Sequence, residues 1–208
     1  MRFRFPSRPS VLLLSLAPLL LAGAPTDQDA FRSDAARLEL RKPSGWHFQS
    51  IETALANRAT VKMNDKEFQK AIEQMASAPI VIASKHAEPY DKLNPSFQVI
   101  VRPAGPLEGK TGSEILGMIE PTLKAQFADL TSVGAIRETS VGGKRAARLT
   151  IRYTLRTQDG REYPTQATLV TIPRGKVLYQ FGFSGPPDGP DAITTEVDTV
   201  LASVRFVE

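Results

Sequence analysis

Three arginines recur along one predicted strand and are the first group of side chains that could bind a ligand. Arg148, Arg152 and Arg156 are spaced four residues apart, which on a strand places them on one face at intervals of about 13 Å. Tyr163 follows after a turn. A two-residue loop at Asp159-Gly160 would bring Tyr163 opposite Arg156, where cation–π stacking is available. Such a row can bind an anionic sugar, a phosphate or the acidic surface of a partner. The alternative is an ordinary solvated strand face, whose charges discourage edge aggregation.

The two histidines suggest a second kind of chemistry. His47 and His86 lie 39 positions apart, and neither has a neighbour at the spacing of a zinc ligand. A small hydrolase could use one of them as a general base, but no Gly-x-Ser-x-Gly motif indicates a nucleophile. His86 lies in a polar segment with Glu88, Tyr90 and Asp91, where a histidine is most often solvated. We therefore predict no catalytic residues, no metal site and no cofactor, and keep a hydrolase using His86 or His47 as the alternative.

Residues 104–111 match a relaxed phosphate-binding loop that ends in Gly-Lys-Thr. Two residues argue against that interpretation. Pro106 removes a backbone N–H that such a loop needs, and Glu108 places a carboxylate where phosphate oxygens would lie. Thr111 and Glu114 instead predict a capping box at the start of a helix.

A three-stranded antiparallel meander over residues 144–183 must position the arginines. Apolar and polar residues alternate from Lys144 to Arg156, which is typical of a half-buried strand. Turns at Asp159-Gly160 and Arg174-Gly175 predict two hairpins. With two-residue loops, Leu149 faces Val170, and the apolar residues of all three strands share one face of the sheet.

Helices and short strands are predicted on either side of this meander. We expect helices at 64–77, around 113–127 and after Pro190, and short strands at 37–41, 80–83, 96–102 and 133–141. Pro121 should kink or divide the second helix. A two-residue turn at Gly142-Gly143 would set Arg137 beside Arg148, and this meeting of like charges makes that register doubtful.

The first 24 residues predict an exported protein. Three arginines precede an apolar run from Val11 to Leu21, which ends at Ala22-Gly23-Ala24, as in a secretory signal peptide. The run is about half as long as the roughly 20 residues of a membrane span, so no transmembrane span is expected after processing. We assign residues 1–24 to the signal peptide, 25–36 to a flexible N-terminal arm and 37–208 to a single α+β domain.

Charge and cysteine content narrow the function classes. The predicted signal peptide holds three of the 26 basic residues and none of the 22 acidic ones, so its removal lowers the net charge from +4 to +1. A nearly neutral protein has no general electrostatic reason to bind nucleic acid. The chain contains no cysteine, which excludes disulfides and thiol chemistry.

The order of elements resembles the PsbP-like α/β/α fold. The resemblance rests on Pro43-x-Gly45-Trp46 after an early strand, on Val141-Gly142-Gly143-Lys144-x-Ala146 at the start of the meander, and on the ending 201–206, Leu-Ala-Ser-Val-Arg-Phe. It implies an α+β fold with a central antiparallel sheet flanked by helices. Among PsbP-like proteins, DcrB-type bacterial envelope proteins best match an exported chain, although this one lacks their lipid-acceptor cysteine.

The function that this resemblance implies is that of a non-enzymatic accessory or binding protein of the bacterial cell envelope, periplasmic or secreted. Its partner would be an envelope protein. A further alternative, which the residues suggest independently of the resemblance, is a protein that binds an anionic envelope polymer through Arg148, Arg152, Arg156 and Tyr163.

Overall fold

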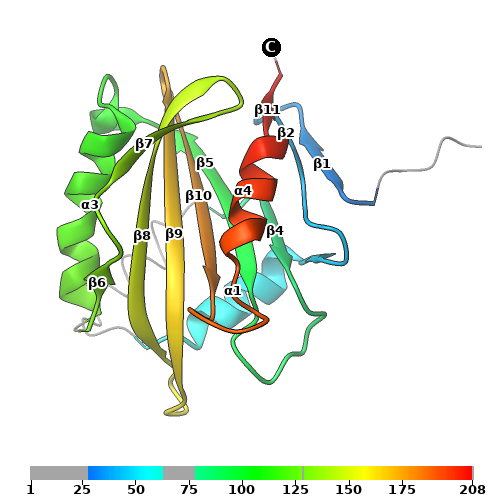
Figure 1. Ribbon diagram of the computed structural model, residues 1–208. Helices are drawn as coiled ribbons and strands as arrows, with labels where there is room; N and C mark the ends of the chain where they lie inside the picture. The colour runs from blue at the N-terminus through cyan, green and yellow to red at the C-terminus, as the bar shows by residue number, and fades with distance from the viewer. Residues whose placement is uncertain (1–27, 63–77, 128, 208) are drawn as a thin grey trace, which may run out of the picture.

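An eight-stranded antiparallel sheet forms the centre of the protein, with helices on both sides of it (Figure 1). The computed structural model describes residues 28–62, 78–127 and 129–207. The strand order is β3-β4-β5-β10-β9-β8-β6, and β7 also pairs with β8. These strands are β3 (His47–Phe48), β4 (Val81–Ser84), β5 (Ser96–Pro103), β6 (Thr131–Ser132), β7 (Arg137–Val141), β8 (Lys144–Arg156), β9 (Glu162–Arg174) and β10 (Val177–Gly185). The predicted α+β fold class is confirmed.

A second, three-stranded sheet brings the two ends of the described chain together. It consists of β1 (Ala30–Ser33), β2 (Leu38–Arg41) and β11 (Arg205–Phe206). We expected residues 25–36 to be a flexible arm, and that prediction is wrong for residues 30–33. These residues form β1 because Phe31 packs against the core and ion pairs join Arg32 to Glu39 and Lys42 to Asp29.

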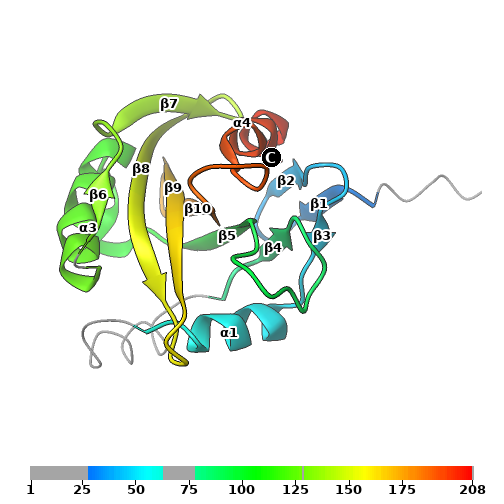
Figure 2. The same ribbon diagram turned by 60° about the horizontal axis from the view of Figure 1, so that its bottom comes forward.

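Within the described ranges, three α-helices lie around the large sheet, and Figure 2 shows their arrangement. They are α1 (Ile51–Ala59), α3 (Gly112–Gln126) and α4 (Thr194–Ser203), and a short 3₁₀ helix, η1 (Gly105–Leu107), precedes α3. The sequence did not predict α1. The predicted capping box is confirmed, since Thr111 Oγ1 accepts the Glu114 N–H and Glu114 Oε2 accepts the Thr111 N–H. α3 continues through Pro121 without division. The predicted signal peptide and the predicted helix 64–77 lie outside the described residues.

The β8–β9 hairpin differs from its predicted register by one residue. Leu149 lies opposite Leu169 rather than Val170. The loop closes with three residues, because the Thr157 N–H donates to Arg161 O and Gly160 adopts a φ of 86°. A three-residue loop with a left-handed glycine is the next commonest hairpin connection after two-residue loops. The odd shift moves every β9 side chain to the face opposite the predicted one.

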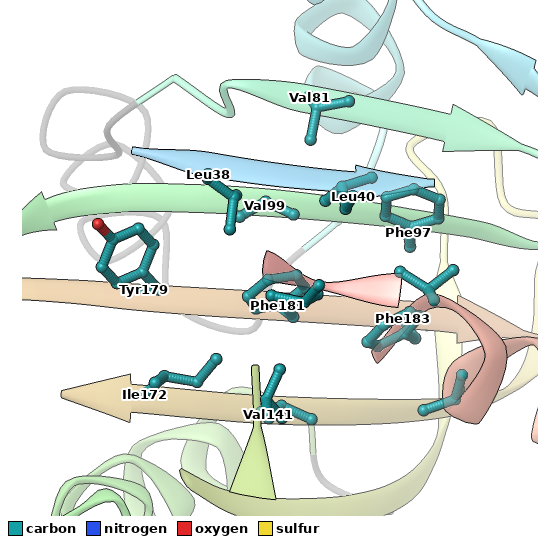
Figure 3. Close-up of a cluster of buried hydrophobic side chains, with 14 of the residues drawn as sticks. Leu38, Leu40, Val81, Phe97, Val99, Val141, Ile172, Tyr179, Phe181 and Phe183 are labelled. Atoms are coloured by element: carbon teal, nitrogen blue, oxygen red, sulfur yellow. The ribbon is translucent and has the colours of Figure 1, made fainter. Parts of the chain in front are cut away.

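The apolar side chains of the meander are therefore divided between the two faces of the sheet. One face contributes Val170, Ile172, Tyr179, Phe181 and Phe183 to a core shared with β4, β5, the small sheet and α4 (Figure 3). The opposite face packs Ala147, Leu149, Ile151 and Ala167 against α3, chiefly against Leu116. The prediction of a single apolar face is wrong. We call these surfaces the α4 face and the α3 face.

The β7–β8 hairpin closes with a two-residue turn at Gly142-Gly143, the register that the like charges of Arg137 and Arg148 made doubtful. Val141 pairs with Lys144 across Gly142 and Gly143, whose φ values are 54° and 72°, as a type I′ turn requires. The pairing places Arg137 directly opposite Arg148. Two like charges are thus neighbours on one face of the sheet.

Candidate functional site

The predicted arginine row lies on the α4 face of β8, and its members have partners within the chain. Arg148 Nη1 donates to Asp198 Oδ1 of α4 at 2.7 Å. Arg152 Nε donates to Gln166 Oε1 at 2.9 Å, and its Nη2 lies 3.9 Å from Asp188 Oδ1. The row is therefore divided among three different environments.

The far end of the row differs from its prediction. Arg156 Nε donates to Glu162 Oε1 at 2.8 Å, and the hydrogen bond to Glu162 raises the pKa of Arg156 above its usual value. Arg156 lies opposite Glu162, while Tyr163 lies opposite Leu155. Tyr163 therefore projects from the α3 face and Arg156 from the α4 face. The predicted stacking of these two side chains is wrong, because it required a two-residue hairpin loop.

Arg137 lies directly opposite Arg148 and was not part of the predicted row. Its side chain forms no ion pair or hydrogen bond with any residue in the described ranges. Its Nη2 lies 3.8 Å from the position that a Cβ on Gly134 would take. The guanidinium thus extends over the β6–β7 connection. The two-residue turn at Gly142-Gly143 predicted that Arg137 lies beside Arg148. Accepting that register, despite the like charges, would have identified Arg137 as the neighbour of Arg148.

A hollow of about 420 Å³ lies beside Arg148, between the β7–β8 turn and α4. Figure 2 shows β7 running toward the end of α4. The lining includes Thr139, Ser140, Arg148, Asp198, Leu201 and Ala202. One part is charged or hydroxylated, and the other is formed by the apolar side chains of Leu201 and Ala202. Asp198 had no local signal in the sequence, because it meets Arg148 across 50 positions of chain.

A second hollow, of about 400 Å³, lies at the start of α3. The segment that resembles a phosphate-binding loop lines it, together with Glu138 and Arg145 of the β7–β8 hairpin. The Glu114 carboxylate already accepts the Thr111 N–H at the helix start, and this bond lowers the pKa of Glu114. Both Glu108 and Glu138 line the same hollow. Lys110 and Arg145 line it as well, so the acidic groups leave the hollow without the excess positive charge that would favour a phosphate.

His86 lies in a polar cluster that joins two loops. Its Nε2 lies 3.1 Å from Asp191 Oδ1, and its ring stacks on Tyr90 with the ring centroids 4.2 Å apart. The Tyr90 hydroxyl donates to Asp191 Oδ2 at 3.3 Å, and Lys85 Nζ lies 3.2 Å from Asp191 Oδ1. The hydrogen bond from His86, helped by Lys85, lowers the pKa of Asp191. The sequence indicated His86 and Tyr90, but Asp191 comes from the Gly/Pro-rich loop before α4.

His47 lies near this cluster, in the edge strand β3. It pairs with Ser84, two residues before His86, so the fold brings both histidines to one edge of the sheet. Ser84 Oγ accepts a hydrogen bond from Gln49 and donates to the His86 backbone carbonyl. Within the described ranges, no three His, Asp or Glu side chains are arranged to hold a metal ion.

Comparisons with known proteins place the fold. No family model matches the chain, and no curated protein matches its sequence. The solution structure of cyanobacterial PsbP (CyanoP) from Synechocystis sp. PCC 6803 matches with a TM-score of 0.53 at 15% identity, over 91% of this chain and 99% of that one. The chain therefore has a PsbP-like fold. At this identity the likeness concerns the fold alone.

Two further structures match less closely. LpqN, involved in cell envelope biogenesis of Mycobacterium tuberculosis, has a TM-score of 0.47 at 10% identity, over 82% of this chain and 83% of that one. A protein from Bacteroides thetaiotaomicron VPI-5482 has a TM-score of 0.48 at 11% identity, over 86% of this chain. The match covers 48% of the Bacteroides protein, about half its length. In the part of our chain that the structure describes, no helix combines the length and apolarity of a membrane span.

Proposed function

We propose that the protein is a non-enzymatic accessory or binding protein of the bacterial cell envelope, exported to the periplasm or secreted, and of the DcrB type among PsbP-like proteins. The predicted signal peptide at residues 1–24 supports export. The PsbP-like fold supports the kinship. Fold alone does not define a function, so the proposal also depends on how the polar side chains are used.

The observation that carries the proposal is the arrangement around Asp191. Its two carboxylate oxygens lie within bonding distance of His86, Tyr90 and Lys85, and Lys85 Nζ also donates to Pro190 O at 2.6 Å. These contacts hold the loop before α4 against the loop between β4 and β5. Side chains that could perform catalysis thus serve to connect two loops, as suits a rigid binding protein.

A second candidate, a small hydrolase, is favoured by the contact between His86 and Asp191. A carboxylate that holds a histidine ring in place is part of the machinery of many nucleophilic enzymes. Here the Asp191 carboxylate contacts His86 Nε2, which leaves Nδ1 of His86 to act as the base. Against it, the ring face is covered by Tyr90, and Ser84 is engaged with Gln49 and the His86 backbone.

Purification of the processed protein from its own envelope fraction tests the proposal against the hydrolase. We expect the protein to fractionate with the envelope, to lose its first residues, and to elute with one stoichiometric partner on size exclusion. A panel of ester, amide and glycoside substrates, assayed on wild type, His86→Ala and His47→Ala, should show no turnover that depends on either histidine. Turnover lost in one of these variants, together with a protein that elutes without a partner, would favour the hydrolase.

A further inference from the structure

Two arginines face each other at the edge of the large sheet without matching negative charge. Arg137 and Arg148 are directly opposed across β7 and β8, at the separation where like charges destabilise a sheet. Arg148 has one carboxylate partner, Asp198, and Arg137 has none within the described ranges. The pair therefore retains an excess positive charge, which an anion in their neighbourhood would neutralise.

The internal partner of Arg148 is easily displaced. The Asp198 side chain is 69% exposed, whereas the Arg148 side chain is 27% exposed. An ion pair with one member so open to water contributes little to stability. Asp198 can rotate into solvent, while Arg148 remains against the sheet. The guanidinium then presents the planar pair of donors that suits a carboxylate or a phosphate.

The neighbouring hollow has the size and lining for the rest of such a ligand. Its volume of about 420 Å³ falls within the range of small-molecule sites. Thr139 shares the face of Arg148, since it lies opposite Ala146, and it lines the same hollow. Leu201 and Ala202 of α4 supply an apolar side.

We propose that the hollow between the β7–β8 turn and α4 binds a small organic oxyanion, a molecule with a phosphate or carboxylate group and a short apolar part. The charged group replaces Asp198 on Arg148 and is attracted by Arg137. The apolar part lies along Leu201 and Ala202. This inference rests on the proposed function, because it gives the binding protein a ligand and a site.

Titration of the processed protein with three probes, followed by amide NMR shifts in chloride-free buffer, tests the site. The probes are butyl phosphate, hexanoate and inorganic phosphate. We expect shifts to concentrate at residues 137–148 and 198–204. Butyl phosphate should bind about three- to tenfold more tightly than inorganic phosphate, because each buried methylene contributes to affinity. The ratio for hexanoate identifies which oxyanion the site prefers.

Three matched variants make the test specific. Arg148→Gln should weaken butyl phosphate binding about tenfold or more, since it removes the charged donor. Asp198→Asn should strengthen binding about threefold or more, because it removes the internal competitor for Arg148. Arg161→Gln, a control at the β8–β9 loop whose partner is Asp159, should leave the affinity within about twofold.

Two results would overturn the inference. One is an affinity in Asp198→Asn that is unchanged or lower, which would make the ion pair purely structural. The other is a set of shifts that spreads over the surface or lies away from the hollow. If Arg148→Gln does not fold, Asp198→Asn and the location of the shifts still decide. Absence of probe binding in a protein that retains its envelope partner would reject the ligand site and leave the proposed function standing. Probe binding in a protein with histidine-dependent turnover would support the ligand site and reject the proposed function.

Discussion

The two faces of the large sheet are covered by different means. The α4 face is covered by α4 and by a small sheet built from both ends of the described chain. Its core includes five aromatic side chains, namely Trp46, Phe97, Tyr179, Phe181 and Phe183. In the described part of the chain, α3 packs on β8 and β9 on the α3 face, with a smaller cluster whose buried members are aliphatic.

This difference separates two ways of stabilising a sheet. The α4 face joins segments that are distant in the sequence, as when the Tyr179 hydroxyl donates to Ala36 O at 2.9 Å across 143 positions. The α3 face joins a helix to strands that follow it closely in the chain. We therefore expect the α4 face to hold most of the free energy of unfolding, and the α3 face to depend on the close approach of α3 to β8 and β9.

Replacement of Phe181 by alanine should have the largest effect on stability. Phe181 is 1% exposed and lies at the centre of β10 on the α4 face. The substitution should lower the free energy of unfolding by about 3–5 kcal/mol, because it removes buried apolar surface and leaves a cavity. Urea unfolding followed by circular dichroism measures the change. A loss below about 1 kcal/mol would contradict the assignment of the main core to this face.

Replacement of Leu116 by alanine is the matched change on the α3 face. Leu116 is fully buried between α3 and the sheet. We expect a loss of about 2–4 kcal/mol, less than for Phe181, because the side chain is smaller and the helix can settle toward the sheet. The same unfolding experiment compares the two variants. A larger loss for Leu116→Ala than for Phe181→Ala would reverse the ranking of the two faces.

A glycine at the start of α3 sharpens the comparison. A Cβ on Gly112 would lie 2.8 Å from both Ala147 N and Thr171 O, which are backbone atoms of β8 and β9. Gly112→Ala should therefore cost about 1–3 kcal/mol by pushing the helix off the sheet. Gly117→Ala is the control, because nothing lies within 4 Å of its Cβ position. It should stabilise the helix by about 0.5–1 kcal/mol. Equal effects at the two glycines would show that the close approach is unimportant.

The comparison also explains which parts of the fold the sequence could predict. Alternation alone predicted β8 with its observed limits, Lys144 and Arg156, and the capping box predicted the start of α3. Both signals are local. α1 was missed, because no comparable apolar stripe or proline stop marks it. β1 was missed because a four-residue edge strand in a polar segment resembles a loop until β2 pairs with it.

The hairpin register needed information that no local pattern contains. Asp159-Gly160 suits a two-residue loop and a three-residue loop alike, and the choice decides the face of every β9 residue. The β9–β10 turn, by contrast, kept the predicted face. A two-residue loop at Arg174-Gly175 would pair Tyr179 with Val170, and Tyr179 pairs with Ile172, two residues further along β9. An even shift preserves the face, and an odd shift inverts it.

The candidate site was predictable only in part for the same reason. Alternation placed Arg148 and Arg152 on one face, and the turn at Gly142-Gly143 placed Arg137 beside Arg148. The carboxylates that meet these arginines come from α4 and from the loop before it. Their positions depend on how α4 packs, which is a property of the assembled core. The role of the arginines in binding stays a prediction.

The last prediction concerns the loop that leads into α4. Low pH should lower the stability of the α4 face and leave that of the α3 face unchanged. Hydrogen bonding to His86, with help from Lys85, lowers the pKa of Asp191 in the folded protein. A carboxyl group with a lowered folded pKa stabilises the fold above its unfolded pKa, and this contribution is lost as the pH falls through the folded pKa. Wild type should therefore exceed Asp191→Asn in stability by about 1 kcal/mol or less above about pH 5, and the difference should shrink toward about pH 3.

Hydrogen exchange locates this effect on the molecule. Because Asp191 joins the loop before α4 to the β4–β5 loop, the Asn variant should exchange faster in α4 and at the β4–β5 loop above about pH 5, with α3 unchanged. Glu196→Gln in the first turn of α4 controls for loss of a nearby acidic charge, and it should leave the exchange of the β4–β5 loop as in wild type. Faster exchange of α3 in the Asp191 variant, or a stability difference that grows as the pH falls, would mean that the two faces do not respond independently to this loop.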